Sequence, residues 1–437
     1  MEIKPFKAYR YDKTVVGDVG ACIAPPYDVI SDQQQQQLYE SSDYNIVRIT
    51  RPKARPTNSV KNNVYTRAAG FFNDWIEQGV LKQDSDQAVY AYVQDFELAG
   101  AWFQRLSFIA LGKLEPFGKI VRPHEHTMLA PRIDRLELKK ATAADFGLVF
   151  LLYEDPDHVA DNIVEKTISD QPLIDFADDQ NVRHRLFAVT NKTDISAVVD
   201  MMNDKTCIIA DGHHRYETGL AYAELSANPT AAYQMMAFTN TCHEGLIVLA
   251  THRLITGLAN FSLDGFLSKL KQHFDVVGLG FDSPESARKA RHQMLARMKT
   301  DHAKDHNTFG IYGGDGAFYV ARLKDITSMD KAAPKMSRAW RRLDVAVISK
   351  LVLDEILGID DEKLARGAHV QYIKDSGNKA KELVRGVDAG DGQIVFFMNA
   401  PKIEHIKAVA EAGERMPQKS TYFYPKVFTG LTIYKLE

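Results

Sequence analysis

Cysteine is scarce in this sequence, which has only Cys22, Cys207 and Cys242 among its 437 residues. They lie far apart and show none of the pair spacings typical of a metal site or a disulfide-rich domain. Long hydrophobic runs are absent too, because no stretch approaches the roughly 18 apolar residues that a membrane-spanning helix needs. The first residues, MEIKPFKAYRYD, have no apolar core like that of a signal peptide. These absences predict a reduced, cytoplasmic protein with no membrane partner.

A strong charge of either sign is also missing. The chain has 54 Lys and Arg against 57 Asp and Glu, which gives a net charge of -3 and a pI of about 6.5. This balance excludes a nucleic-acid-binding surface built on bulk positive charge, so we expect no nucleic-acid partner. The content of 45% hydrophobic and 25% charged residues is that of an ordinary soluble protein, and the length allows two or three domains.

Hydrophobic periodicity predicts a mixture of helices and strands. Apolar residues recur every three or four positions over residues 57–79, which predicts an amphipathic helix. Residues 88–98 and 105–117 alternate like two antiparallel strands, with Gly100 in the connection. Residues 207–212 predict a short strand that leads into a helix over residues 213–227.

The pattern changes after residue 255. Residues 307–323 predict a hairpin whose turn is the stretch GGDG, residues 313–316. This turn resembles a phosphate loop only superficially, because a strand rather than a helix follows it. A helix is predicted over residues 345–357, and the C-terminal part adds a strand and one more helix.

The stretch ADGHHRYE carries the most chemistry. Asp211 is predicted to cap the helix, and Gly212 permits a tight turn close to a ligand. The free N–H groups and dipole of a helix start favour an anion, and Arg215 can bind phosphate with two hydrogen bonds. His213 and His214 diverge by about 100° on a helix, so they suit flanking one anion better than chelating one metal. The pattern favours a phosphate or nucleotide contact, with metal ligation and plain capping as alternatives.

A second polar stretch, RPHEHTMLAPRIDR, spans Arg122–Arg135, and we place no regular element there. On a strand, His124 and His126 would point to one face and could hold a metal. In an irregular loop, Glu125 would instead serve as a general base beside histidine hydrogen-bond partners. A solvated polar loop without chemistry is the third interpretation.

A third stretch, MPQKSTYFYPK, lies near the C-terminus. Its Lys419, Ser420 and Thr421 supply a cation and two hydroxyls in three residues, which suits a phosphate or a small polar substrate. It is not a P-loop, because the upstream glycines are missing. The alternative is a surface tail anchored by its tyrosines.

These motifs together resemble a widespread prokaryotic family of unknown function, over nearly the whole chain. The resemblance is carried by KPFKAYRY, APPYDVIS, PHEHTMLAPRIDRLEL, ADGHHRYETGLAY, GLIVLATHRLI, LDVAVISKLVLDEILGI and MPQKSTYFYP. More distantly, SFIALGKLEPFGKIVRPHE followed by IIADGHHR is similar to the archaeal free serine kinase, a member of the ParB/sulfiredoxin-like superfamily.

The kinase resemblance implies roles for particular residues. It makes Glu125 the catalytic base, with His124 and Lys419 beside it. It gives the phosphate-binding role to Asp211, Gly212, His213, His214 and Arg215. The substrate-binding role falls to Ser420, Thr421 and His126. It also implies ATP or ADP as the nucleotide, with CTP as a further candidate, and Mg²⁺ as its companion. No residue is assigned as a protein ligand of a metal.

The predicted fold is α+β, with a mixed ParB/sulfiredoxin-like core over residues 101–255. An N-terminal α/β segment, 1–100, and a C-terminal α/β segment, 256–437, extend it, and the latter contributes to the site. The predicted function is a small-molecule kinase that acts on a hydroxyl acceptor such as free serine or a related metabolite. One alternative is a nucleotide-binding regulatory or interaction protein without phosphotransfer. Another is a metal-dependent hydrolase that uses the four histidines of the two motifs.

Overall fold

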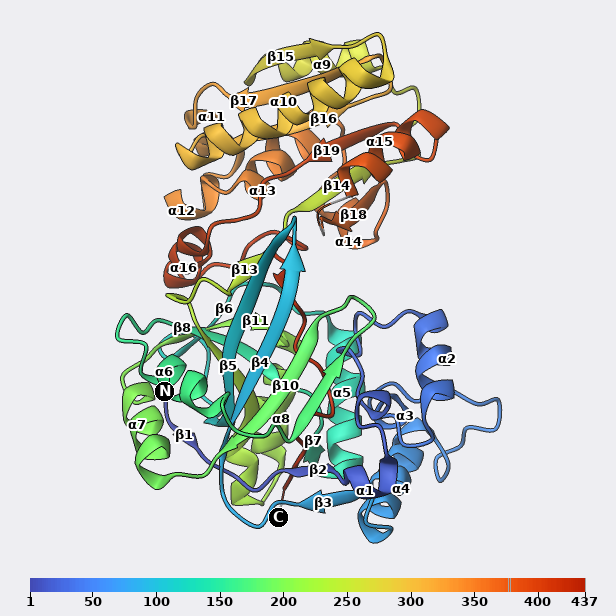
Figure 1. The fold of residues 1–437 in the computed structure, drawn as a ribbon. Coiled ribbons are helices and arrows are strands. Elements are labelled where there is room, and N and C mark those ends of the chain that lie inside the picture. The colour runs from blue at the N-terminus through green and yellow to red at the C-terminus, as the bar shows by residue number, and fades with distance from the viewer. Residues whose placement is uncertain (376, 378, 437) are drawn as a thin grey trace. The chain divides into compact units, whose positions relative to one another are not determined.

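The computed structural model describes residues 1–375, 377 and 379–436 (Figure 1). Helices account for 37% and strands for 25% of the chain, so the predicted α+β class is confirmed. The ParB/sulfiredoxin type of the core stays a prediction.

The chain divides into two units. Unit 1 comprises Met1–Ile247 together with Pro425–Glu437, and unit 2 comprises Val248–Tyr424. The predicted N-terminal segment and the predicted core both supply strands to one sheet of unit 1. The boundaries of the three predicted segments stay predictions.

In the described part of the chain, unit 1 has a nine-stranded sheet of order β6-β11-β8-β12-β5-β4-β10-β9, with β1 paired to β5. The two longest strands, β4 and β5, form the predicted antiparallel pair. Their two-residue turn, Ala99 and Gly100, has positive φ at both positions, as a type I′ turn requires. The bounds of the sheet strands are β1 Ile3–Lys4, β4 Val89–Leu98, β5 Ala101–Lys113, β6 Val121–Pro123, β8 Val149–Tyr153, β9 Ile174–Ala177, β10 Arg183–Val189, β11 Cys207–Asp211 and β12 Tyr233–Asn240.

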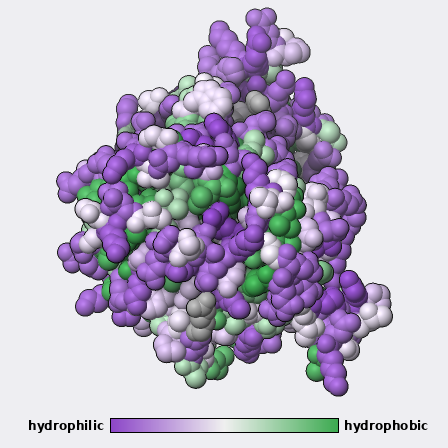
Figure 2. Space-filling view, turned by 60° about the horizontal axis from the view of Figure 1, so that its bottom comes forward, coloured by the Kyte–Doolittle hydropathy of each residue, from purple (hydrophilic) through white to green (hydrophobic). Residues whose placement is uncertain are grey.

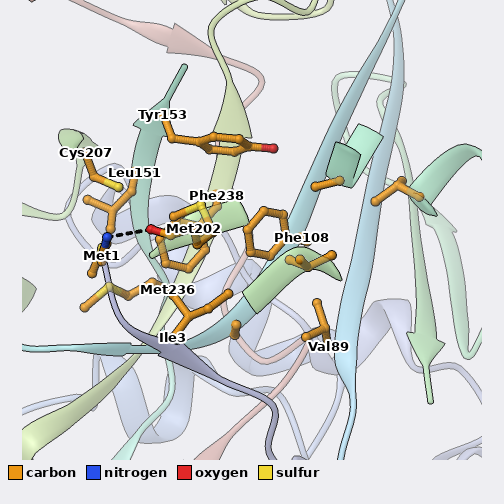
Figure 3. Packing of buried hydrophobic residues seen from close by; sticks show 14 of the residues in the cluster. Met1, Ile3, Val89, Phe108, Leu151, Tyr153, Met202, Cys207, Met236 and Phe238 are labelled. Atoms are coloured by element: carbon orange, nitrogen blue, oxygen red, sulfur yellow. Dashed lines mark hydrogen bonds between the residues drawn. The ribbon is translucent and has the colours of Figure 1, made fainter. Parts of the chain in front are cut away.

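The core of unit 1 follows the two-residue period of its strands. Alternate side chains of β4, β5, β8 and β12 gather in one apolar cluster, in which the rings of Phe108 and Phe238 stack 4.9 Å apart (Figure 3). Helices α6 (Val159–Thr167) and α7 (Lys192–Met202) contribute their apolar faces to the same cluster. This packing fixes the central strands that lead to the candidate site.

Helix α5 (Leu129–Thr142) begins within the polar stretch Arg122–Arg135, for which no regular element is predicted. Pro131 stands in its first turn, where a backbone N–H has no intrahelical acceptor, so the proline is tolerated. The helix packs against α8 (His213–Leu225) and α4 (Val64–Glu77). Tertiary contacts with these two neighbours, rather than an obvious apolar period, account for α5.

Unit 2 has a six-stranded sheet in its described residues, of order β15-β17-β16-β19-β14-β18. Strands β16 and β17 form the predicted hairpin. The helix predicted over residues 345–357 begins as α13 and continues as the π-helical segment η3. The elements are β14 Thr251–Ile255, α9 Leu263–Leu270, β15 Phe274–Gly280, α10 Pro284–Ala303, β16 Thr308–Tyr312, β17 Ala317–Leu323, α11 Thr327–Ala332, α12 Arg338–Arg341, α13 Asp344–Val347, η3 Ile348–Ile356, α14 Asp361–Ala365, β18 Val370–Lys374, α15 Lys379–Ala389, β19 Ile394–Phe397, α16 Ile403–Glu411 and β20 Phe423–Tyr424.

Short elements complete the chain. They are β2 Tyr9–Tyr11, α1 Lys13–Val16, η1 Gly20–Cys22, α2 Asp32–Ser41, α3 Val47–Thr50, β3 Leu81–Gln83, β7 Ala144–Asp145, η2 Pro229–Ala232, β13 Ile247–Val248 and β21 Tyr434–Lys435. Strand β21 pairs with β7, so the last residues of the chain, from Pro425 on, belong to unit 1.

The surface is largely hydrophilic on the face that Figure 2 presents, with hydrophobic residues gathered around a hollow near its centre. Among the described residues, no helix has both the length and the apolar character needed to cross a membrane.

Candidate functional site

The parallel pair of strands β6 and β11 defines the candidate site. Pro123 of β6 lies opposite Ile209 of β11. Because parallel strands end at the same edge of a sheet, the loop that begins with His124 and the turn after Asp211 leave the sheet together. Ligands of open α/β sheets often bind at such carboxyl ends. Two of the three motifs singled out in the sequence therefore meet at one edge of unit 1.

Gly212 makes the turn between β11 and α8. Its φ of 88° lies in the left-handed region, where glycine is favoured. Gly212 itself is the N-cap of α8, and no side chain caps this helix, so the predicted capping by Asp211 is wrong. Asp211 instead ends β11, and its Oδ1 accepts a hydrogen bond from the Gly212 N–H at 2.7 Å. The carboxylate holds the turn rather than the first turn of the helix.

Lys426 is a residue of the site that the sequence reasoning missed. Its Nζ lies 2.9 Å from Asp211 Oδ2. Burial would raise the pKa of Asp211, but the charges of Lys426 and Arg215 outweigh it and hold that pKa well below its usual range. The sequence contains Lys426 in the Pro-Lys that ends MPQKSTYFYPK, but within this stretch the sequence analysis assigns Lys419 to the site.

The paired histidines of the turn anchor the neighbouring loop. His213 Nε2 accepts from the backbone N–H of His124 at 3.3 Å, and His214 Nε2 accepts from that of Met128 at 2.9 Å. The ring of His124 lies with Nδ1 2.5 Å from the carbonyl oxygen of Ile209, to which it donates. A ring nitrogen that accepts carries no proton, so His213 and His214 are neutral in this arrangement.

Glu125 lies between the two anchored positions of the loop and is half-buried. Burial lowers the pKa of His124 and of His214, and the negative charge of Glu125 opposes the shift in both rings. Glu125 thus belongs to the loop that His213 and His214 anchor, while its catalytic role stays a prediction.

A carboxylate of α8 strengthens the connection. Thr127 Oγ1 donates to Glu217 Oε2 at 2.6 Å, and Arg132 Nε lies 3.0 Å from the same oxygen. Residues 124–128 are thus held to α8 by its first, second and fifth residues. The loop is fixed relative to the helix start, as a positioned base would require.

Arg215 is turned inward. Its side chain is 11% exposed, and Nη1 donates to the backbone carbonyl of Leu148. The guanidinium covers Gly212, where an added Cβ would come within 3.0 Å of Arg215 Nε. In this arrangement Arg215 packs against the turn at Gly212, and its predicted binding of a phosphate stays a prediction.

The other predicted residues are His126, which belongs to the same loop, and Lys419, Ser420 and Thr421. His126 is exposed. Lys419, Ser420 and Thr421 belong to unit 2, where Lys419 has a φ of 57° and Ser420 is buried, so their predicted roles stay predictions. Within the described ranges, no group of three or more His, Cys, Asp or Glu side chains could hold a metal ion.

The chain is similar to one family model and to several solved structures. A family model described as a protein of unknown function, DUF1015, matches residues 3–346. Free serine kinase in complex with AMP is 15% identical with a TM-score of 0.32, and the match covers 70% of this chain and 89% of that one. A conserved hypothetical protein from Pyrococcus furiosus is 14% identical with a TM-score of 0.31, covering 70% and 88%. C-terminally truncated SbnI from Staphylococcus aureus is 10% identical with a TM-score of 0.34, covering 75% and 87%. No curated protein matches the sequence.

Proposed function

This chain belongs to DUF1015, a family of proteins of unknown function, and we propose that it is a nucleotide-dependent kinase acting on a small hydroxyl-bearing metabolite. The observation that carries the proposal is the meeting of the Glu125 loop and the start of α8 at the ends of β6 and β11. The two motifs that the sequence comparison with the archaeal kinase singled out are thereby neighbours in space.

The nucleotide's phosphates would bind at the start of α8. The first N–H groups of a helix lack intrahelical acceptors, and its dipole favours negative charge there. Lys426 adds a cation at the same turn, 2.9 Å from the carboxylate of Asp211. Mg²⁺ would be held mainly by phosphate oxygens and water, as is usual for this ion, because the carboxylate of Asp211 is already paired.

Glu125 would take the proton of the acceptor's hydroxyl. The deprotonated oxygen would form a bond to the terminal phosphorus as the bond to the leaving nucleotide breaks. Phosphoryl transfer depends mostly on positioning and on neutralising charge, so a loop fixed by His213 and His214 suits it. His124 would position this loop, and His126 would contact an acceptor such as free serine.

The Glu125→Gln variant tests the base. Loss of a general base lowers the turnover of comparable enzymes by about 10²–10⁴-fold, whereas nucleotide affinity should stay within about two-fold. Phosphorylated product from a panel of hydroxy amino acids and the calorimetric dissociation constant for ATP or ADP with Mg²⁺ are the two measurements. Glu137→Gln, at a glutamate of α5 whose side chain is 43% exposed, is the matched control.

The outcomes separate the parts of the proposal. Full activity of Glu125→Gln would show that the base is assigned wrongly. Nucleotide binding without a phosphorylated product from any acceptor would favour a nucleotide-binding regulatory protein. If no nucleotide raised the thermal midpoint of the wild type, the nucleotide site itself would be disproved.

A further inference from the structure

A cavity that Arg215 and Gly147 help to line lies inside unit 1. It has a volume of about 50 Å³ and is lined by residues of α5, β7, α8, β12 and the C-terminal segment. A buried water needs roughly 10–15 Å³ of such space, so the cavity would admit several waters or one small ligand group. Nothing in the kinase proposal uses it.

The polar lining offers both donors and acceptors, and Asp145 Oδ2 and Gln234 Oε1 are buried acceptors without a donor among the described residues. Thr429 is 3% exposed, and none of the described residues hydrogen-bonds to its hydroxyl. The same holds for the hydroxyl of Tyr27, and burial raises the pKa of Tyr27 to about 12, so this hydroxyl keeps its proton. Arg215 Nε is buried without an acceptor in the part of the chain that the structure describes. Buried donors of this kind are rarely left unmatched in proteins.

Three cations line the cavity, and two of them have a close carboxylate partner. Lys139 pairs with Asp145 at 2.8 Å, and Arg135, whose guanidinium stacks on Tyr27, pairs with Asp134 at 2.5 Å. These two cations of the lining are therefore neutralised.

Arg215 is the third cation and is not balanced in the same way. It lies 3.9 Å from Asp211, whose carboxylate is held more closely by Lys426 at 2.9 Å. A negatively charged group in the cavity would give Arg215 a second anionic partner, and buried charges are normally paired.

Gly147, which has no side chain, leaves part of the cavity open between Arg215 and Thr429. A Cβ added at this position would come within 3.3 Å of Arg215 Nη1 and 3.4 Å of Thr429 Oγ1. The missing side chain thus keeps open a place that both polar groups border. A carboxylate, with two acceptor oxygens and a single charge, matches this setting in size, charge and hydrogen bonding.

We propose that this cavity binds the carboxylate group of a small organic acid, between Arg215 and Thr429 over Gly147. The site is separate from the nucleotide site, and binding there needs no nucleotide. Acetate and glycolate are the probes, inorganic phosphate is the comparison, and sodium chloride at equal ionic strength is the reference.

The test follows thermal unfolding of the full chain at pH 7 without nucleotide, together with calorimetry. Acetate or glycolate should raise the midpoint in a saturable manner beyond chloride. Gly147→Ala should weaken this response at least ten-fold. Gly70→Ala, at a glycine of α4 where an added Cβ meets no atom within 4 Å, should leave it unchanged.

A second variant covers the case in which Gly147→Ala does not fold. Thr429→Val keeps the shape and removes the donor, and it should weaken carboxylate binding at least three-fold. No saturable effect of either carboxylate, or an equal response in wild type and Gly147→Ala, would overturn the proposal. Tighter binding of phosphate than of both carboxylates would overturn the assignment to a singly charged group. None of these results depends on whether the chain is a kinase.

Discussion

Unit 1 contains a buried and a half-buried lysine–aspartate pair, which have almost the same separation in space but very different separations in sequence. Lys139 and Asp145 are six residues apart in sequence, 2.8 Å apart in space, and 4% and 6% exposed. Lys426 and Asp211 are 215 residues apart in sequence, 2.9 Å apart in space, and 14% and 19% exposed. The first pair joins α5 to the strand that follows it, whereas the second ties the C-terminal segment to the proposed phosphate turn. Similar geometry can therefore support a local fold in one place and a proposed binding site in the other.

Breaking the local pair should have the largest effect on stability. Lys139→Met leaves the carboxylate of Asp145 buried without its cation, and removing one partner of a buried pair costs about 3–5 kcal/mol. Urea unfolding measures the loss. Lys166→Met, which breaks the exposed pair with Asp194, should cost at most about 1 kcal/mol. A loss as small as that of this control would contradict the structural role given to Lys139.

Breaking the pair of Lys426 and Asp211 should lower the unfolding free energy less, but it should also weaken nucleotide binding. Lys426→Met should cost about 2–3 kcal/mol, because its pair is less buried and Asp211 keeps the Gly212 N–H. Nucleotide affinity should fall about ten-fold or more, whereas Lys139→Met should leave it within about two-fold. Calorimetry with ADP measures both variants. Equal affinities in the two would remove the distinction between the pairs.

The same pair predicts a difference in pH dependence. The pKa of Asp211 is held below its unfolded value, so the pair stabilises the folded state above pH 4 and the gain is lost as the pH falls further. Lys426→Met removes the main cause of this depression. Its unfolding free energy should therefore decline less steeply between pH 4 and pH 3 than that of the wild type, and a parallel decline would contradict the account.

The backbone of the turn should contribute on a smaller scale. Gly212→Ala forces a side chain into a left-handed φ of 88° and against Arg215, at a cost of about 1–2 kcal/mol. Gly70→Ala, in the middle of α4, should be neutral or slightly stabilising. Chemical unfolding of the two variants side by side checks this, and equal stabilities would show that the turn tolerates a Cβ.

The histidines that join the loop to the turn should give the smallest effect. Burial lowers the pKa of His124 and His214 below the unfolded value of 6.5, so the unfolded chain binds more protons just below that pH. Stability should fall as the pH drops from 6.5 towards 5. His214→Gln, which still accepts from the Met128 N–H but does not titrate there, should flatten this fall. The exposed His292→Gln should not change it.

Much of this organisation could be predicted from the sequence, and the misses have physical causes. The alternation of β4 and β5 and the strand–turn–helix at residues 207–225 are local patterns, so they were recognised. The helix predicted from residue 57 begins at Val64, because Asn63 and Thr66 form a capping box that periodicity alone does not locate. Helix α5 is not predicted from the sequence, because its stability comes from contacts with α4 and α8.

In the candidate site, too, the residue types could be predicted from the sequence, whereas the contacts between distant parts of the chain could not. Glu125 and the Asp211–Arg215 turn were singled out by residue type, and the parallel pairing of β6 with β11 brings them together. No local pattern reports that pairing, nor the 215-residue separation that Lys426 spans to reach Asp211. Asp211 was predicted as a cap because strand-end and cap positions are adjacent in sequence, and the left-handed Gly212 decides between them.

Hydrogen–deuterium exchange with and without ADP and Mg²⁺ tests the central claim most directly, because it shows where the nucleotide binds. Bound nucleotide should slow exchange in residues 124–128 and in residues 212–216. The phosphates would accept hydrogen bonds from the N–H groups at the start of α8 and would reduce the motion of the loop that is hydrogen-bonded to this helix. Protection confined to other parts of the chain, or none at saturating nucleotide, would contradict the account.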